Sequence, residues 1–415
     1  MPVAARPSLG RRKAIGFSVA LLVMGIVGFV AFGLGSASGL DTTFIFSPRN
    51  EALLDLTFPS RSWAMILSGL VIGLGLAELL RNPPRRAYIL LLAGIALFVT
   101  ALLVWAARDS TLSIFGLLNG SIRRSIPIGL GAMAGLLCER SGVINIAIEG
   151  MMLAGAFVGS VIGSAAGSVW VGLAGGAAIG ALLGLFLATL SIRYVVDQIV
   201  GATVINILAI GLTSFLTAQV LVEHPDLNRP GGFRPFAIPL LVEIPIVGPL
   251  FFDNTIYVYL LFGLAGFLTW ALFQSRWGLR LRSVGEHPRA ADTVGIRVNA
   301  TRYKAVTLGG IVAGVAGTFF TLDATGGFDE EMTAGRGFIA LAALIFGRYH
   351  PIGALMAALV FGFSEELQDR LALLSTPIPS EFLLMTPYIV TIVVVAGLVG
   401  RARPPAADGQ PYTTG

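Results

Sequence analysis

The chain has 415 residues, of which 55% are hydrophobic and only 12% are charged, and its mean hydropathy is +0.83. One soluble core cannot bury so many apolar runs, so the composition excludes a soluble globular protein and predicts an all-α integral membrane protein. The net charge of +5 does not indicate nucleic-acid binding, because the basic residues lie at the ends of apolar runs.

Apolar runs follow one another along most of the chain. Nine of them approach the ~20 residues that a membrane helix needs, and they lie at 14–35, 62–80, 87–107, 144–166, 168–190, 199–221, 251–274, 303–325 and 383–400. Three shorter or interrupted runs lie at 122–138, 336–347 and 352–370. The sequence therefore predicts a polytopic inner-membrane protein with about 10–12 transmembrane helices, some of them broken or re-entrant.

Charged residues at the ends of these runs predict how the chain is oriented. If all the runs cross, both termini lie in the cytoplasm, which suits the basic segment 6–13 and the pair Arg401 and Arg403. The first run follows Arg11 and lacks a convincing cleavage site, so we interpret it as a retained anchor. The loop 222–250 then lies outside, and its six prolines suit a compact segment.

The predicted spans divide into an extension and a core. Residues 1–110 are predicted to form a three-span N-terminal extension, and residues 111–400 the membrane core. Within the core, 126–157 and 308–346 share one order, an apolar helix, a polar glycine-containing break and a second apolar helix, which suggests an internal repeat. The last segment, 401–415, is rich in Pro, Ala and Gly and is predicted to be a disordered cytoplasmic tail.

Three polar residues lie inside apolar spans of the core. Asn145 and Glu149 are four residues apart, so a helix would place them on one face. A charge at the membrane centre costs roughly 2.5–3.5 kcal/mol, so Glu149 should face protein or a watery cavity. It would then lie on a substrate path, or brace a broken helix through backbone N–H groups. Asn206 could bind a polar substrate or form an interhelical hydrogen bond.

A cluster of charged residues lies near the outer end of the span 303–325. Asp323, Glu330, Glu331 and Arg336 could shape a vestibule, meet an external partner or form a solvated loop. Together with an aromatic residue in the next apolar run, these observations give the predicted substrate-path residues: Asn145, Glu149, Asn206, Asp323 and Phe338.

The sequence has no visible catalytic apparatus. Its two lysines, Lys13 and Lys304, do not occur in a G-x-x-x-x-G-K-[ST] phosphate loop. It also lacks a G-x-S-x-G nucleophile motif and a paired His–Glu metalloprotease motif. The single cysteine, Cys138, and three scattered histidines predict no metal site. We therefore expect a protein that is not an enzyme and that binds no cofactor or metal of its own.

An arginine-rich island, 275–304, separates two apolar spans. It contains seven basic residues against two acidic ones, which predicts a cytoplasmic loop. Within it, Pro288 can begin a helix and Gly295 can end it. The apolar side of this two-turn helix would be Ala290, Ala291 and Val294. A short surface helix of this kind suggests a docking element.

Three stretches carry a family resemblance: ERSGVINIAIEGMMLAGAF at 139–157, GLRLRSVGEHPRAADTVGI at 278–296 and MTAGRGFIALAALIFGRYHPIGALMAALVFG at 332–362. Over about 110–400, the chain resembles a bacterial ABC-importer permease of the branched-chain amino acid, ribose and nucleoside group. Within that group it is most similar to permeases of BMP-lipoprotein-dependent nucleoside importers of the guanosine type. The first hundred residues depart from the minimal family core.

The resemblance implies a transmembrane subunit that forms the path for purine and pyrimidine nucleosides. It implies three protein partners: a second, homologous permease that forms a heterodimer with this chain, an ATPase subunit with two nucleotide-binding domains that carries ATP–Mg, and an extracytoplasmic substrate-binding lipoprotein. Membrane lipid is a further expected partner. Residues 285–296 would form the cytoplasmic coupling helix of this chain, which is seated in a cleft of the separate ATPase. The residues that would couple the two proteins are Gly285, Glu286, Pro288, Arg289, Ala290, Ala291, Asp292, Val294 and Gly295. The alternatives are a ribose or other sugar permease, and an ion-driven transporter in which Glu149 or Asp323 carries the proton.

Overall fold

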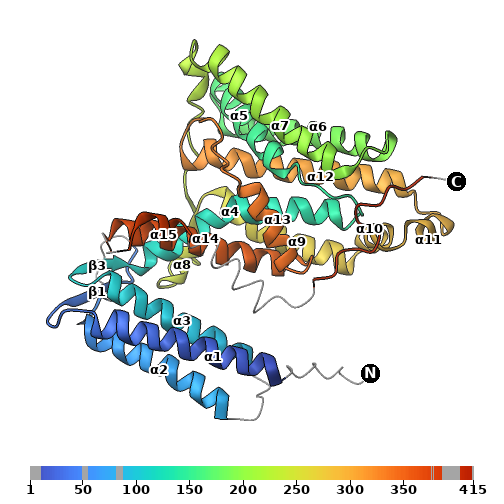
Figure 1. Ribbon diagram of the computed structural model, residues 1–415. Coiled ribbons are helices and arrows are strands. Elements are labelled where there is room, and N and C mark those ends of the chain that lie inside the picture. The colour runs from blue at the N-terminus through green and yellow to red at the C-terminus, as the bar shows by residue number, and fades with distance from the viewer. Residues whose placement is uncertain are drawn as a thin grey trace. The chain divides into compact units, whose positions relative to one another are not determined.

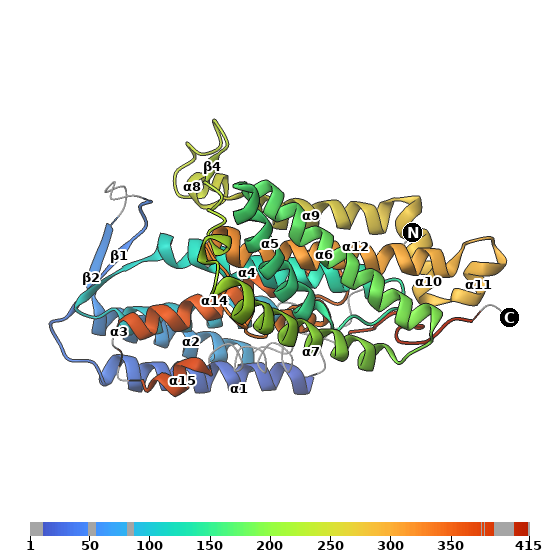
Figure 2. The same cartoon turned by 90° about the horizontal axis from the view of Figure 1, so that it is seen from above.

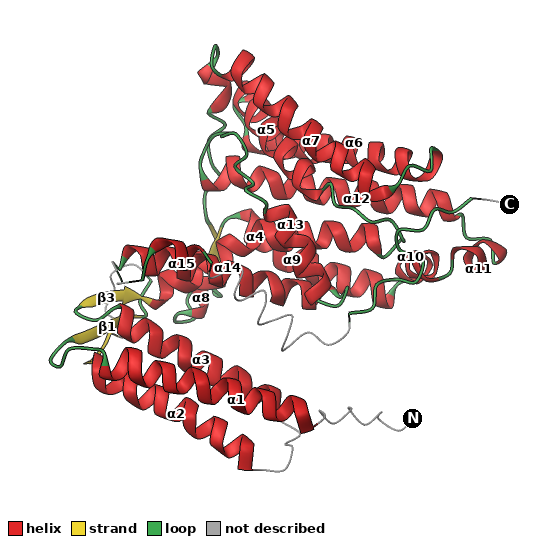
Figure 3. Ribbon diagram, in the orientation of Figure 1, coloured by secondary structure: helices red, strands yellow, loops and turns green. Residues whose placement is uncertain are grey.

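The computed structural model describes residues 11–48, 55–80, 87–374, 376, 378–385 and 402–413. This part of the chain is mostly helical (Figures 1 and 3). Eight of the described helices are long and apolar enough to cross a membrane: Ile15–Leu34, Ser60–Leu80, Ile89–Ala106, Ile148–Ala166, Val169–Arg193, Gln198–Leu221, Ile256–Gln274 and Val298–Ala324. The predicted class of polytopic helical membrane protein is confirmed. Most of the predicted span 383–400 lies outside the described residues.

The chain divides into two compact units, Met1–Leu118 with Leu367–Leu398, and Asn119–Glu366 with Val399–Gly415. The first unit contains α1 (Arg11–Val27), its π-helical continuation Gly28–Leu34, α2 (Ser60–Leu80), α3 (Ala87–Ala106) and α15 (Ser380–Leu384). Leu21, Val71 and Leu91 form the buried contact among α1, α2 and α3. The three predicted N-terminal spans are therefore three packed helices.

A small sheet in the first unit was not predicted from the sequence. Its strand order is β2 (Asp55–Pro59), β1 (Asp41–Ile45), β3 (Ser110–Ser113), with β1 antiparallel to β2 and parallel to β3. The buried Thr42 hydroxyl hydrogen-bonds the Ser60 hydroxyl at 2.7 Å and donates to the Val104 carbonyl at 2.9 Å. These bonds join the sheet to the ends of two of the helices.

The second unit holds the helices of the predicted core. They are α4 (Ile114–Glu139, which begins in the first unit), α5 (Ile148–Ala166), α6 (Val169–Ala188), α7 (Gln198–Leu216), α9 (Ile256–Gln274), α10 (Arg276–Glu286), α11 (Pro288–Thr293), α12 (Val298–Phe319), α13 (Arg336–Phe346) and α14 (Pro351–Leu373, which ends in the first unit). The π-helical turns η2 (Thr189–Arg193), η3 (Thr217–Leu221) and η5 (Phe320–Ala324) extend α6, α7 and α12. The loop after η3 contains η4 (Pro225–Asn228), β4 (Phe236–Ala237), α8 (Val247–Phe252) and β5 (Asp253–Asn254), and β4 pairs with β5.

Local chemistry explains several helix ends. The Asp197 carboxylate accepts hydrogen bonds from the backbone N–H groups of Ile199 and Val200 and so caps α7. The Ser275 hydroxyl accepts from the N–H of Gly278 and caps α10. At the C-terminal end of α5, Gly167 adopts a φ of +60°, which glycine tolerates better than residues with a Cβ.

The three short predicted runs have different outcomes. The run 122–138 belongs to the longer α4, which contains Pro127, and 352–370 belongs to the 23-residue α14. Both helices are longer than the apolar runs from which they were predicted. The run 336–347 is the 11-residue α13, about 16 Å long at 1.5 Å per residue, which is half the thickness of a bilayer core. The prediction that this run is too short to cross a bilayer unless it is tilted or a half-helix is consistent with this length.

Glycine lets α5, α6 and α12 approach one another closely. The three helices lie side by side (Figures 1 and 2). A Cβ on Gly314 of α12 would collide with the carbonyl oxygen of Gly176 on α6, and a Cβ on Gly155 of α5 would collide with that of Gly314. Small residues at such crossings allow backbone contact in membranes, where apolar burial does not drive helices together.

The tail differs from the prediction of disorder. Residues 402–413 lie along α10 and α12 (Figure 1) and form defined hydrogen bonds. The Ala407 N–H donates to the Gly285 carbonyl at 2.9 Å, and the Arg302 guanidinium donates to the Gln410 carbonyl at 2.9 Å. Composition could not reveal these partners, because both lie more than a hundred residues earlier in the chain.

We expect Gly314→Leu to destabilise the protein, because overpacking of a tight contact usually costs about 1–3 kcal/mol. Gly266→Leu is the matched control, since a Cβ at Gly266 of α9 meets no atom within 4 Å. Thermal unfolding of the purified full chain in detergent checks this. Equal unfolding midpoints for the two variants would contradict the packing described for α5, α6 and α12.

Candidate functional site

The Glu149 carboxylate caps a buried helix end. Glu149 lies in the first turn of α5 and is only 6% exposed. Its two oxygens accept from the Thr333 hydroxyl at 2.6 Å, the Gly335 N–H at 2.9 Å and the Gly337 N–H at 2.6 Å. These donors surround the N-terminus of α13, where backbone N–H groups lack intrahelical partners and the helix dipole favours a negative charge. The contacts match the interpretation of Glu149 as a brace for a broken helix.

Two asparagines complete the break between α4 and α5. Asn206, on α7, accepts from the Gly150 N–H at 2.8 Å and donates to the Ile146 carbonyl at 3.0 Å, which is the interhelical bond expected as one alternative. Asn145 accepts from the Ala147 N–H at 3.0 Å. Because α5 begins only at Ile148, Asn145 lies outside the helix, and the condition under which Asn145 and Glu149 would share a helical face is not met.

A cavity of about 370 Å³ lies beside the C-terminal end of α12. Its lining combines aromatic and aliphatic surface with charged and hydroxyl groups, from Gly120, Arg123, Arg124, Pro127, Phe319, Phe320, Ala324, Thr325, Asp329, Met332, Arg336 and Glu366. The volume falls within the range of about 300–1,000 Å³ typical of small-molecule pockets. None of the five predicted substrate-path residues is among the lining residues.

All three arginines of this cavity have carboxylate partners. Arg123 pairs with Asp323 at 2.8 Å, Arg124 with Glu366 at 2.8 Å, and Arg336 with Glu365 at 3.2 Å. The Arg336 guanidinium also lies over the Phe320 ring, 5.7 Å from its centroid. Paired charges supply hydrogen bonds without a strong preference for either sign of ligand charge, so the cavity suits a neutral polar molecule with an apolar face.

Of the charged cluster that the sequence analysis singled out, only Arg336 lines this cavity. Asp323 reaches it through Arg123, whereas Phe338 is 48% exposed and is not among the lining residues. The missed residues include Arg123, Arg124, Phe319 and Phe320. Two adjacent arginines within an apolar stretch are expensive in a membrane and were the available signal.

The predicted coupling residues lie around the N-terminal end of α12. Pro288 is the first residue of α11, and Gly295 has a φ of +81° just after it, so both predicted helix signals are present. The sequence did not predict that the segment before α11 forms α10, which ends at Glu286 and is separated from α11 by His287. Glu286, Arg289, Ala290, Asp292 and Val294 are exposed.

Two predicted coupling residues lie inside the chain. Ala291 is 3% exposed and packs with Val284 and Val298, so its predicted contact with a partner is corrected to an internal one. Gly285 is also buried, and a Cβ there would meet the Arg140 carbonyl. A two-turn helix packed on α10 and α12 must turn one side inward, and sequence pattern could not show which alanine that side contains.

The tail adds a half-buried acidic group, Asp408, beside this element. Burial raises the pKa of Asp408 above its ordinary value, and the nearby Arg302 opposes part of that shift. Within the described ranges, no three His, Cys, Asp or Glu side chains lie together as metal ligands.

Comparisons with known proteins identify relatives of the core. The family described as "Branched-chain amino acid transport system / permease component" matches residues 117–400. The chain is 42% identical over 298 residues to the guanosine ABC transporter permease protein NupQ of Bacillus subtilis. These residues make up 70% of this chain and 93% of NupQ. It is 39% identical over 303 residues to the nucleoside ABC transporter permease protein NupC of Lactococcus lactis subsp. cremoris, covering 69% and 93% of the two chains.

A second Bacillus subtilis relative is more distant. The guanosine ABC transporter permease protein NupP is 25% identical over 256 residues, 58% of this chain and 70% of NupP. No solved structure matches the chain. The N-terminal residues before 117 lie outside the family match.

We expect Glu149→Ala to lower the free energy of unfolding by about 3 kcal/mol or more, because three buried donors lose a charged acceptor. Glu149→Gln should be intermediate, since an amide accepts at one end only. The control is Glu330→Ala, an exposed carboxylate in the loop before α13. Thermal unfolding in detergent provides the measurement. A Glu149→Gln protein that is as stable as wild type and loses only uptake would instead favour a proton-carrying role.

Proposed function

The chain belongs to the permease-component family of the branched-chain amino acid transport system, and we propose that it is the permease subunit of an ABC importer for nucleosides. The assignment of the substrate rests on the 42% identity to the guanosine permease protein NupQ, which extends across nearly all of that relative. NupC, whose name specifies nucleosides, has a similar identity and coverage. The family and these relatives both concern transport rather than catalysis.

The chemistry of the cavity beside α12 supports a nucleoside as the substrate. A nucleobase presents a flat apolar face and an edge of hydrogen-bonding groups, and its ribose adds hydroxyl groups. Phe319, Phe320 and Met332 supply apolar surface, while the paired arginines supply hydrogen-bond donors. Stacking on aromatic side chains contributes about 1–3 kcal/mol per base in proteins that bind single strands.

We propose that ATP hydrolysis takes place in a separate ATPase with two nucleotide-binding domains. The sequence itself has no phosphate-binding lysine motif, so the energy must come from another chain or from an ion gradient. The exposed face of α11 offers Arg289, Ala290 and Val294 to such a partner. Since Ala291 packs on Val284 of α10 and Val298 of α12, a force on α11 would reach α12, whose far end carries Phe319 and Phe320.

The remaining partners follow from the same proposal. A second, homologous permease would complete the pathway, and the occurrence of both NupQ and NupP in Bacillus subtilis supports a heterodimer. A lipoprotein would deliver the nucleoside at the external face. The excess of basic residues in 275–304 supports a cytoplasmic location for α10 and α11. The membrane would be a bacterial inner membrane, with both termini of the chain in the cytoplasm.

We expect Ala290→Glu to abolish uptake of labelled guanosine by cells that express the complete importer, because it places bulk and negative charge on the exposed side of α11. Ala290→Ser is the matched control and should retain uptake. Both proteins should reach wild-type amounts in the membrane, as the side chain does not pack inside the chain. Undiminished uptake by Ala290→Glu would exclude the assigned coupling face. Uptake by this chain alone that an uncoupler stops would favour the ion-driven alternative.

Unlabelled nucleosides should compete with labelled guanosine, whereas ribose should not compete at the same concentrations. The base provides the stacking surface that a free sugar lacks, so its loss should weaken competition at least 10-fold. Initial uptake rates at increasing competitor concentration provide the test. Equal competition by ribose would replace the nucleoside assignment with the sugar alternative.

A further inference from the structure

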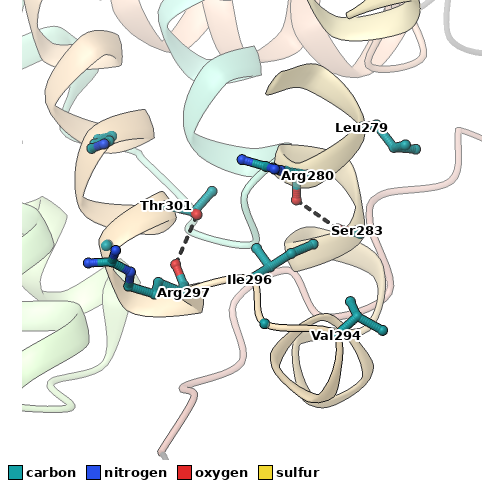
Figure 4. A pocket seen from close by; sticks show the side chains of 10 residues that line it. Leu279, Arg280, Ser283, Val294, Ile296, Arg297 and Thr301 are labelled. Atoms are coloured by element: carbon teal, nitrogen blue, oxygen red, sulfur yellow. Dashed lines mark hydrogen bonds between the residues drawn. The ribbon is translucent and has the colours of Figure 1, made fainter. Parts of the chain in front are cut away.

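A groove of about 730 Å³ lies at the N-terminal end of α12, away from the cavity described above. Figure 4 shows its walls, which are one side of α10, the segment between α11 and α12, and the first two turns of α12. The residues that line it are Leu279, Arg280, Ser283, Val294, Gly295, Ile296, Arg297, Ala300, Thr301 and Lys304. Neither the family nor its relatives' names assign a role to this groove.

The groove concentrates positive charge without compensation. Arg280, Arg297 and Lys304 line it, and its lining contains no acidic residue. In the described part of the chain, none of these three side chains forms an ion pair or a cation–π contact with an aromatic ring. The three arginines of the other cavity, in contrast, are all paired. Like charges that share a groove repel one another, so an anion bound among them is stabilised.

The beginning of α12 adds further attraction for an anion. This 22-residue helix begins at Val298, and the side chain of its N-cap residue, Arg297, provides no cap hydrogen bond. Backbone N–H groups and the helix dipole at such an end favour a phosphate. The Ser283 and Thr301 hydroxyls already donate to the carbonyls of Arg280 and Arg297, as the dashed lines in Figure 4 show. The available donors are therefore the cationic side chains and the helix N-terminus.

Apolar side chains on the rim indicate the rest of the ligand. Leu279 is 62% exposed and Val294 is 74% exposed, and both line the groove. On the same short helix, Trp277 is exposed next to Arg276. A short helix that exposes Trp, Leu and Arg together is typical of the membrane–water interface. Because α12 is long and apolar enough to cross a membrane, we expect its first turns at that interface.

We propose that this groove binds the headgroup of an anionic phospholipid. Its phosphate would lie among Arg280, Arg297, Lys304 and the N-terminus of α12, and its acyl chains would lie against Leu279. The inference rests on the membrane location of α12 and on the charge of the groove, and it does not depend on which substrate is transported. A lipid held there would contact α10 and α12, the two helices on which α11 packs.

The test uses the full chain, purified in detergent and stripped of lipid. Phosphatidylglycerol should raise its midpoint of thermal unfolding in a saturable way, while phosphatidylethanolamine and inorganic phosphate should not. Each of Arg280→Gln, Arg297→Gln and Lys304→Gln should raise the half-saturating phosphatidylglycerol concentration roughly 5-fold, as expected for one cation near an anionic surface. Lys304→Arg, which keeps the charge, should resemble wild type.

Arg276→Gln is the matched control, because Arg276 is an exposed arginine of α10 that does not line the groove. An equal effect of Arg276→Gln and Arg280→Gln would overturn the site. An equal response to the two phospholipids would overturn selectivity for anionic lipid, and full stabilisation by inorganic phosphate would assign the groove to a soluble anion. If only a purified partner ATPase stabilises the chain, and the three groove variants abolish that effect, the groove is a protein contact and the proposal fails. Uptake is not the readout, so this result is separate from that of the proposed function.

Discussion

The short helix α13 depends on the buried carboxylate of Glu149. A helix that begins inside a protein leaves backbone N–H groups that water cannot reach, and each of them needs an acceptor. Glu149 accepts from Thr333, Gly335 and Gly337 and thereby joins the start of α5 to the start of α13. The charge that would be costly in lipid is stabilised by these charge-assisted bonds. This one contact therefore satisfies donors at the start of α13 that would otherwise lack an acceptor.

The long helix α12 connects the two regions to which we assign function. Its first turns pack against α10 and α11, and its last turn and η5 contribute Phe319, Phe320 and, through Arg123, Asp323 to the cavity. Between these ends, glycines such as Gly314 hold α12 in backbone contact with α5 and α6. A tightly packed helix of this kind can transmit a displacement from one end to the other, because its neighbours leave little free space.

Apolar run length and helix signals predicted much of the fold. The spans of the core, the start of α11 at Pro288 and its end near Gly295 follow from local chemistry, so the sequence contained them. The cavity depends on pairs such as Arg123 with Asp323, which lie 200 residues apart in the chain. The inward side of α11, where Ala291 rather than Ala290 is buried, depends on packing against Val284 and Val298. Single-sequence reasoning could not supply these long-range contacts, and for the same reason the order of the 402–413 tail was missed.

The central claim is that a separate ATPase acts on the membrane core through α11, and labelling of Ala290→Cys tests it most directly. The only native cysteine, Cys138, is buried, so a membrane-impermeant maleimide should report on the introduced thiol. The account predicts labelling from the cytoplasmic side only, and strong protection when the partner ATPase is assembled. Labelling from the external side, or labelling that the ATPase leaves unchanged, would contradict it.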